Sequence, residues 1–137
     1  MKLLESFRMG SLMLKNRMVM AAMTRSRADI HGVVGTMTAE YYAQRASAGL
    51  ILSEASNISA NALGSPLTPA CLKKNRSPPG AKSRRPCMKK AESFSAQLWH
   101  TGRVGHSVDR GGQLPVAPSA VKIEGAQHFT SQGMKDY

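Results

Sequence analysis

The fold of this chain is decided by residues 36–59, which read TMTAEYYAQRASAGLILSEASNIS. The first half predicts a helix, because Thr36 is a plausible N-cap and Glu40 falls in the first turn. Apolar side chains share one helical face at Met37, Tyr41 and Ala48. Gly49 then stands where a helix C-cap glycine is expected. The pattern therefore predicts one helix that begins at Thr36 and ends at Gly49.

Short apolar runs lie on both sides of this predicted helix. Leu50–Leu52 follows it at once and predicts a short buried strand, while residues 18–23 precede it and predict another. Leu12 and Leu14 alternate with other side chains, which indicates a small hairpin before the first strand. A strand, a helix and a strand with short connections favour a parallel βαβ unit.

A third strand is predicted at residues 94–100, FSAQLWH, with Phe94 and Leu98 as its apolar partners. A second helix should come between the second and third strands, but the sequence there would break one. The breaking residues are Pro78, Pro79, Gly80 and Pro86. Residues 102–137 are rich in Gly and Pro, and we expect loop without a clear element there.

The positive charge is concentrated in one segment. The chain has 137 residues, with 19 Lys and Arg against 8 Asp and Glu, a formal net charge of +11. Residues 70–95 hold eight of the basic residues and one acid, so 11 basic and 7 acidic residues remain elsewhere, a net +4. A polyanion-binding function would therefore depend on residues 72–90, where clustered Lys and Arg suit weak, salt-sensitive phosphate contacts. No aromatic residue interrupts this cluster, which speaks against stacking on single-stranded nucleic acid.

The cysteine spacing and the hydropathy pattern speak against a metal-binding, a disulfide-stabilised and a membrane-spanning protein. Cys71 and Cys87 lie 16 residues apart, without a CxxC pair or histidines at zinc spacing, so neither a metal site nor a disulfide framework is predicted. No run approaches the roughly 18 apolar residues of a membrane span. The N-terminus lacks the apolar run of a secretory signal. We expect a cytoplasmic protein with no membrane and no specific nucleic-acid partner.

Three stretches resemble one known family. They are NRMVMAAMTRSRA (residues 16–28), AEYYAQRASAGLILSEASNIS (39–59) and AQLWHTGRVGH (96–106), followed by LPVAPSA (114–120). Together they look like the N-terminal part of the old yellow enzyme family, the FMN-dependent ene-reductases, and most like its N-ethylmaleimide reductase and xenobiotic reductase branch. The resemblance covers residues 3–69 and 96–137 in order.

The resemblance implies an α/β fold, the (β/α)8 TIM barrel, which needs roughly 250 residues. We expect residues 1–137 to be the N-terminal part of such an FMN-binding barrel, with a capping hairpin, about three of the eight strands and a disrupted second barrel helix. In this family NAD(P)H passes a hydride to FMN, and the reduced flavin passes a hydride to an electron-poor alkene. The expected cofactors are FMN and NAD(P)H, and the expected partner is a small-molecule alkene.

The resemblance also implies a flavin site at the carboxyl ends of the strands, where barrel sites lie. Ala22 and Met23 would line the flavin through backbone groups, and Thr24 would hydrogen-bond its carbonyl edge. Ala22 replaces the usual proline of the motif. Considered alone, a threonine after a strand is more often a turn or cap residue.

The second and third strands supply the other expected contacts. Ala55 corresponds to the small residue beside the flavin ring, and the Gln97 amide matches the N–H and C=O edge of the isoalloxazine. Alone, a strand-end glutamine would be expected to bond backbone. Trp99 resembles the aromatic wall of the substrate pocket, although a tryptophan is more often core or lid packing. Gly64 is followed by Ser65, where this branch commonly has a tyrosine near the substrate.

No catalytic residue and no metal ligand is assigned. His100 and Arg103 are expected to orient their loop, since neither has a visible partner for catalysis. The residues that hold the substrate carbonyl and donate a proton belong to family sequence that has no counterpart here. We therefore expect the chain to be an N-terminal fragment that is inactive by itself.

Residues 70–95 match nothing in the family, yet the spacing between the matched halves is preserved. Our hypothesis is an out-of-frame segment, with one base lost near Pro69 and one gained near Ser95. Back-translation with one chosen set of codons, read in the shifted frame, gives a segment of the same length. It has apolar residues at helical spacing, then two glycines, then an apolar start to the third strand. The alternative is a genuine divergent basic loop.

Overall fold

The computed structural model describes residues 1–70 and 93–137. The predictions for the basic segment 72–90, for both cysteines and for a disrupted second helix fall outside these residues. So does most of the suspected out-of-frame segment. No helix in the described part of the chain is long and apolar enough to cross a membrane.

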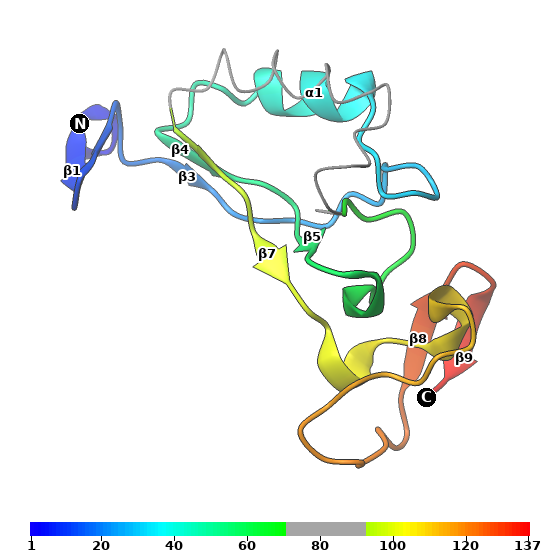
Figure 1. Ribbon diagram of the computed structural model, residues 1–137. Helices are drawn as coiled ribbons and strands as arrows, with labels where there is room; N and C mark the ends of the chain where they lie inside the picture. Colours follow the sequence, from blue (N-terminus) through cyan, green and yellow to red (C-terminus); the bar gives the residue numbers. More distant parts are fainter. Residues whose placement is uncertain (71–92) are drawn as a thin grey trace.

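The predicted N-terminal hairpin is present. After a 3-10 turn at Lys2–Leu4, strand β1 (Phe7–Met9) pairs antiparallel with β2 (Leu12–Leu14). Gly10 occupies the turn with a φ of 59°, in the left-handed region that favours glycine. The hairpin lies at one end of the molecule (Figure 1).

The central feature is a parallel sheet, as the βαβ pattern predicted. Strand β3 (Val19–Met20) pairs with β4 (Leu50–Leu52), and β4 pairs with β6 (Phe94–Ser95). Farther along the same chain segments, β5 (Ser56–Asn57) pairs in parallel with β7 (Leu98–Trp99). The predicted third strand is therefore interrupted between β6 and β7.

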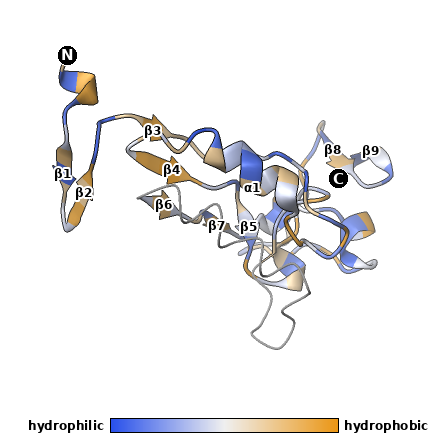
Figure 2. Ribbon diagram, turned by 90° about the horizontal axis from the view of Figure 1, so that it is seen from above, coloured by the Kyte–Doolittle hydropathy of each residue, from blue (hydrophilic) through white to orange (hydrophobic). Residues whose placement is uncertain are grey.

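The apolar sequence of the first strand predicted that it would be buried, but the structure shows that it is not. Val19 is 52% exposed, whereas Leu50 and Ile51 of the central strand β4 are 7% and 0% exposed. Figure 2 shows the apolar strands β3, β4 and β6 side by side. β3 has no described strand on its outer side, which explains why only the middle strand is fully covered.

Helix α1 (Thr36–Ala43) packs on the sheet, but its ends and its buried face differ from the prediction. Its N-cap is Gly35, which makes no side-chain capping bond, so Thr36 is the first helical residue. The buried side chains are Thr38 and Tyr42, whereas Met37 is 67% exposed. In Figure 1 the helix lies over β3 and β4.

The core between helix and sheet is small and centres on Tyr42 and Ile51. Met20 and Phe94 pack against this pair, among other partly buried side chains. The rings of Tyr42 and Phe94 meet edge to face, with centroids 5.2 Å apart. Edge-to-face pairs of this kind add to the free energy of simple apolar burial. This contact joins α1 to the third strand segment.

Gly49 is not a helix C-cap, because α1 ends six residues earlier. A Cβ atom at Gly49 would lie 2.0 Å from the backbone oxygen of Asn16. The Gly49 N–H donates to Met18 O at 2.9 Å. Glycine is therefore required here for a close approach of two backbones at the start of the β3–β4 pair.

The prediction of featureless loop for residues 102–137 is wrong. This part holds two 3-10 helices, Gly102–Val104 and Ser107–Arg110, and an antiparallel hairpin of β8 (Gln127–Thr130) and β9 (Gly133–Asp136). A further 3-10 turn, Ala60–Ala62, follows β5. The β8–β9 hairpin and these turns lie together beyond the carboxyl ends of the parallel strands (Figure 1).

Candidate functional site

Contacts between the strand ends bring the predicted flavin residues of three strands to one edge. The Arg25 N–H donates to Glu54 Oε2 at 2.9 Å, so the residue after Thr24 contacts the residue before Ala55. Ser56 pairs with Leu98, which places Ala55 beside Gln97. Thr24, Ala55 and Gln97 therefore lie in neighbouring segments at the carboxyl end of the parallel strands. Ligands of α/β sheets and barrels bind at this end.

These side chains differ in how much surface they offer. Thr24 and Gln97 are exposed, and Met23 is 44% exposed. Among the described residues neither the Thr24 hydroxyl nor the Gln97 amide has a hydrogen-bond partner; the Gln97 backbone N–H donates to Ser53 Oγ at 3.2 Å. Ala55 is 3% exposed, and Ala22 is half-buried. Within the described residues, the edge thus presents an unpaired hydroxyl and an unpaired amide close to a buried small residue.

A carboxylate lies buried behind this edge. Glu54 is 1% exposed, and its Oε2 accepts a hydrogen bond from the Arg25 backbone N–H at 2.9 Å. The Glu54 backbone N–H donates to the Tyr42 hydroxyl at 2.7 Å. Burial raises the pKa of Glu54, and the backbone N–H groups of Arg25 and Ser26 oppose that shift. Glu54 therefore connects α1, the central strand and the turn after β3.

Trp99 is held against the second strand by its indole nitrogen. Trp99 Nε1 donates to Asn57 Oδ1 at 2.6 Å, and the two residues are also paired in register. Asn57 is 2% exposed, and its amide donates to Thr68 Oγ1 at 2.9 Å and to Pro69 O at 3.0 Å. The indole ring is therefore fixed in its orientation.

The loops that follow the first and second strands bind one another. Ala28 N donates to Leu67 O at 3.0 Å, and Ala70 N donates to Gly32 O at 3.0 Å. Leu67 has a φ of 56°, an uncommon conformation for a residue with a Cβ. These bonds fix the loops around the carboxyl edge of the sheet.

The loops after the second and third strands are joined by Arg110. Arg110 is 7% exposed, and its Nε donates to Leu63 O at 3.0 Å while Nη2 donates to Thr101 Oγ1 at 3.1 Å. A Cβ at Gly64 would lie 2.2 Å from the Thr101 side chain, and one at Gly105 would lie 2.2 Å from the Arg110 guanidinium. A side chain at Gly64 would therefore displace Thr101, and one at Gly105 would displace the Arg110 guanidinium.

Histidines and acids lie beside Arg110. The rings of His106 and His128 are stacked with centroids 6.4 Å apart, and His128 Nδ1 lies 3.1 Å from the Tyr137 hydroxyl. Burial lowers the pKa of His128, the nearby Asp109 raises it, and His106 and Arg110 lower it further. In the described part of the chain no group of three or more His, Cys, Asp or Glu could hold a metal ion. This cluster anchors the β8–β9 hairpin.

The other residues expected to orient their loop do so. His100 Nδ1 accepts a hydrogen bond from Gly102 N at 3.0 Å, and Arg103 Nη2 donates to Ser119 Oγ at 3.2 Å. Both contacts stay within the segment that follows the third strand.

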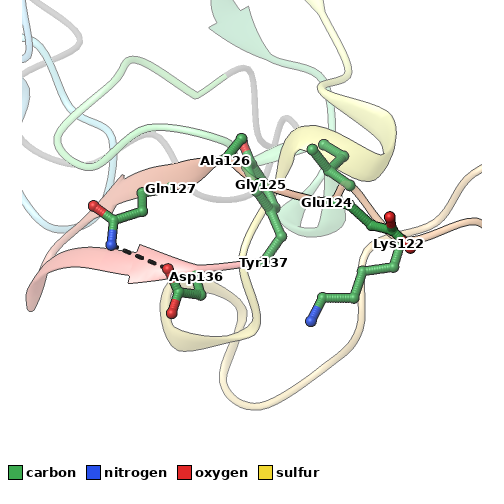
Figure 3. A pocket seen from close by; sticks show the side chains of 8 residues that line it. Lys122, Glu124, Gly125, Ala126, Gln127, Asp136 and Tyr137 are labelled. Carbon is green, nitrogen blue, oxygen red and sulfur yellow. Dashed lines mark hydrogen bonds between the residues drawn. The ribbon is translucent and has the colours of Figure 1, made fainter.

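An open hollow of about 590 Å³ lies elsewhere, between residues 122–126 and the β8–β9 hairpin. Figure 3 shows Gln127 and Asp136 joined across the hairpin, where Gln127 Nε2 donates to Asp136 Oδ1 at 3.0 Å. Lys122 lies on the opposite side of the hollow. None of the predicted flavin residues lines it.

The chain matches the NADH:flavin oxidoreductase / NADH oxidase family over residues 2–136. It belongs to that family. Among curated proteins it is 38% identical to flavin oxidoreductase hxnT of Emericella nidulans over 86% of this chain and 32% of that protein. It is also 38% identical to 12-oxophytodienoate reductase 7 of Oryza sativa subsp. japonica, over 77% of this chain and 27% of that protein. The chain thus spans about a third of the length of these relatives.

Solved structures agree with this assignment. The old yellow enzyme homologue from Zymomonas mobilis superposes with a TM-score of 0.87 at 41% identity, over 99% of this chain and 38% of that one. Morphinone reductase superposes with a TM-score of 0.84 at 42% identity, over 98% of this chain and 37% of that one. The predicted family is confirmed, and with it the α/β fold of the TIM-barrel class.

Sequence reasoning missed Glu54, Tyr42 and Arg110. Glu54 could have been noticed, because it is a single charge two residues after the apolar run of the central strand. Tyr42 falls outside the apolar stripe of Met37, Tyr41 and Ala48 that the sequence predicts as the buried face. Nothing local marks Arg110, whose partners Leu63 and Thr101 are remote in sequence.

Proposed function

We propose that this chain is the N-terminal part of an FMN-dependent NAD(P)H oxidoreductase that reduces activated alkenes. Its residues would form one edge of the flavin site, on a partial barrel that consists of a capping hairpin and about three strands. The observation that carries the proposal is the pair of contacts, Arg25 N–H to Glu54 and the Ser56–Leu98 pairing, that brings the segments of Thr24, Ala55 and Gln97 together. The morphinone reductase structures include a complex with tetrahydroNAD, which supports a nicotinamide reductant.

The residues present fit a flavin edge. An isoalloxazine offers carbonyl oxygens and an N–H along one side, so it needs a donor and an acceptor at neighbouring positions. Thr24 can donate through its hydroxyl, and Gln97 can donate and accept through its amide. Both are exposed and have no described partner, while Ala55 leaves no side chain projecting between them.

Bound FMN would supply the hydride transfer, and the protein would supply binding and orientation. Gln97 and Thr24 would fix the ring by hydrogen bonds, and a donor at the flavin carbonyl would favour the reduced, more electron-rich ring. Ala22 and Met23 would contact it through their backbone. Trp99, held by Asn57, would form one wall against which a small alkene packs. Cytoplasmic location accords with these soluble cofactors.

The chain alone is proposed to be inactive and to retain FMN poorly, because it spans about a third of its relatives. Open strand edges such as that of β3 also favour association between chains. The out-of-frame origin of residues 70–95 is part of the same proposal, because the family match continues on both sides. The alternative, polyanion binding by residues 72–90, has no support from the described residues.

Gel filtration of the 137-residue chain with added FMN tests retention directly. We expect the flavin to elute apart from the protein, whereas co-elution of stoichiometric yellow flavin would contradict the fragment proposal. Amide NMR during FMN titration tests the site itself. We expect resonances of residues 22–24 and of Gln97 to shift while those of the β8–β9 hairpin stay, and a uniform or absent response would contradict it.

A further inference from the structure

The central strand carries one extra residue at the candidate site. The numbers of paired residues differ by 43 between β4 and β6, where Ile51 pairs with Phe94. They differ by 42 between β5 and β7, where Ser56 pairs with Leu98. Residues 53–55 therefore oppose only residues 96 and 97, which is the geometry of a β-bulge. Bulges next to active sites re-aim side chains. Here the bulge places Glu54 inside the protein.

The bulge is held by hydrogen bonds on each side. Ser53 Oγ donates to Glu54 O at 2.8 Å and accepts from Gln97 N at 3.2 Å. The Glu54 N–H donates to the buried Tyr42 hydroxyl at 2.7 Å. The backbone of Glu54 is therefore held by contacts to the helix and, through Ser53, to the third strand.

The carboxylate of Glu54 serves the turn that follows the first strand. Its Oε2 accepts the Arg25 N–H at 2.9 Å, directly after Thr24. Ser26, the next residue, has a φ of 51°. A serine in this conformation needs outside support, because left-handed backbone is unfavourable for residues with a Cβ. The carboxylate supplies that support by accepting backbone N–H groups.

The same carboxylate is unsuited to a purely packing role. Its Oε1 is buried without a hydrogen-bond partner among the described residues. The Arg25 guanidinium is directed elsewhere, donating to the Tyr41 hydroxyl at 3.1 Å. A buried acid with one unsatisfied oxygen is costly, and an apolar residue would pack here at lower cost. Its geometric effect on the turn is therefore the better explanation for its presence.

We propose that Glu54 is a positioning residue that fixes the turn of residues 24–26 and thereby aims the Thr24 hydroxyl at the ligand edge formed with Gln97. The identity of that ligand as FMN depends on the proposed function, whereas the effect on the turn does not.

Amide NMR of the 137-residue chain tests the effect on the turn. The amides of Thr24, Arg25 and Ser26 should titrate together with a midpoint above the ordinary glutamate value of about 4.3. Glu54→Gln, which keeps one carbonyl acceptor, should abolish the titration and leave the Arg25 and Ser26 amides protected from hydrogen exchange. Glu54→Ala should remove that protection and shift the Thr24 resonances. The matched control Glu40→Gln, at an exposed acid on α1, should change neither readout.

Two results would overturn the positioning role. One is a titration of these amides that persists in Glu54→Gln, and the other is an unchanged Thr24 in Glu54→Ala.

Titration of the same proteins with FMN separates this inference from the proposed function. Thr24→Ala and Glu54→Ala should weaken the flavin-induced shifts at Gln97 alike, and the double variant should weaken them no further, because Glu54 acts through Thr24. Additive losses would refute action through Thr24. If FMN causes no shifts in any variant, the flavin proposal fails while the pH and exchange results still decide the role of Glu54.

Discussion

Replacing Tyr42 with phenylalanine should destabilise the chain by about 1–3 kcal/mol, because one buried donor loses its acceptor. The Tyr42 hydroxyl accepts the Glu54 backbone N–H at 2.7 Å, and Glu54 is 1% exposed, so water cannot replace the bond. The ring stays, and with it the edge-to-face contact with Phe94, so no cavity is added. The expected loss is therefore the cost of leaving one buried N–H unpaired.

Urea unfolding monitored by the fluorescence of Trp99, the single tryptophan, measures this loss. With a urea slope of about 2 kcal/mol/M, a loss of about 2 kcal/mol lowers the midpoint by about 1 M. Tyr41→Phe is the matched control, since among the described residues the Tyr41 hydroxyl accepts only from the exposed Arg25 side chain. Its effect should stay within about 0.5 kcal/mol. Equal midpoints for the two variants would refute the assigned role of the Tyr42 hydroxyl.

Two further predictions concern other parts of the fold. Gly49→Ala should cost about 1–3 kcal/mol or more in the same assay, since its Cβ would lie 2.0 Å from the Asn16 backbone oxygen. Gly35→Ser is the control, because a side chain at this helix N-cap would meet open space, and it should change stability by only a few tenths of a kcal/mol. Similar losses in Gly49→Ala and Gly35→Ser would contradict the close approach at Gly49. Because burial lowers the pKa of His128, the unfolded chain binds more protons below about pH 6.5, so stability should fall as the pH is lowered through that value. The urea midpoint of His128→Gln should not show this loss of stability at low pH. An unchanged pH dependence in that variant would contradict the assigned role of His128.

The parallel arrangement could be predicted because it follows from local pattern. Leu50–Leu52 is a continuous apolar run with a helical segment before it, and both its burial and its parallel pairing are as expected. The family motifs placed Thr24, Ala55 and Gln97 after successive strands, and contacts between neighbouring residues bring these segments together. Their contacts with a flavin remain a prediction.

The structure differs from the sequence prediction where tertiary contacts override the local preference of a segment. Met37 and Tyr41 suggested the buried face of α1, but Tyr42 is the buried residue, because its hydroxyl can reach the bulge at Glu54. Gly49 looked like a helix end, although its partner Asn16 comes from a different segment. The β8–β9 hairpin has exposed apolar side chains such as Phe129, 60% exposed, so its sequence lacks the usual alternation of buried apolar residues.

The reading-frame hypothesis for residues 70–95 has a direct check in the nucleotide sequence across Pro69 and Ser95. We expect compensating single-base changes relative to an intact family gene. Peptide mass mapping of the expressed protein gives the same answer at the protein level. An uninterrupted frame that encodes Cys71 and Cys87 in independent isolates would refute the hypothesis and favour a divergent basic loop.

The most direct test of the flavin edge is FMN retention by a complete barrel that has this chain as its first part. Residues 1–137, with 70–95 in the restored reading, would be fused to the remainder of the Zymomonas mobilis homologue, which aligns at 41% identity. The fusion should hold FMN, and Gln97→Ala should weaken its affinity by about tenfold, as expected for loss of one or two hydrogen bonds. Gln44→Ala, at an exposed amide just after α1, should leave the affinity unchanged. A fusion that folds without binding FMN, or equal affinities for the two variants, would contradict the assignment of this edge to the flavin.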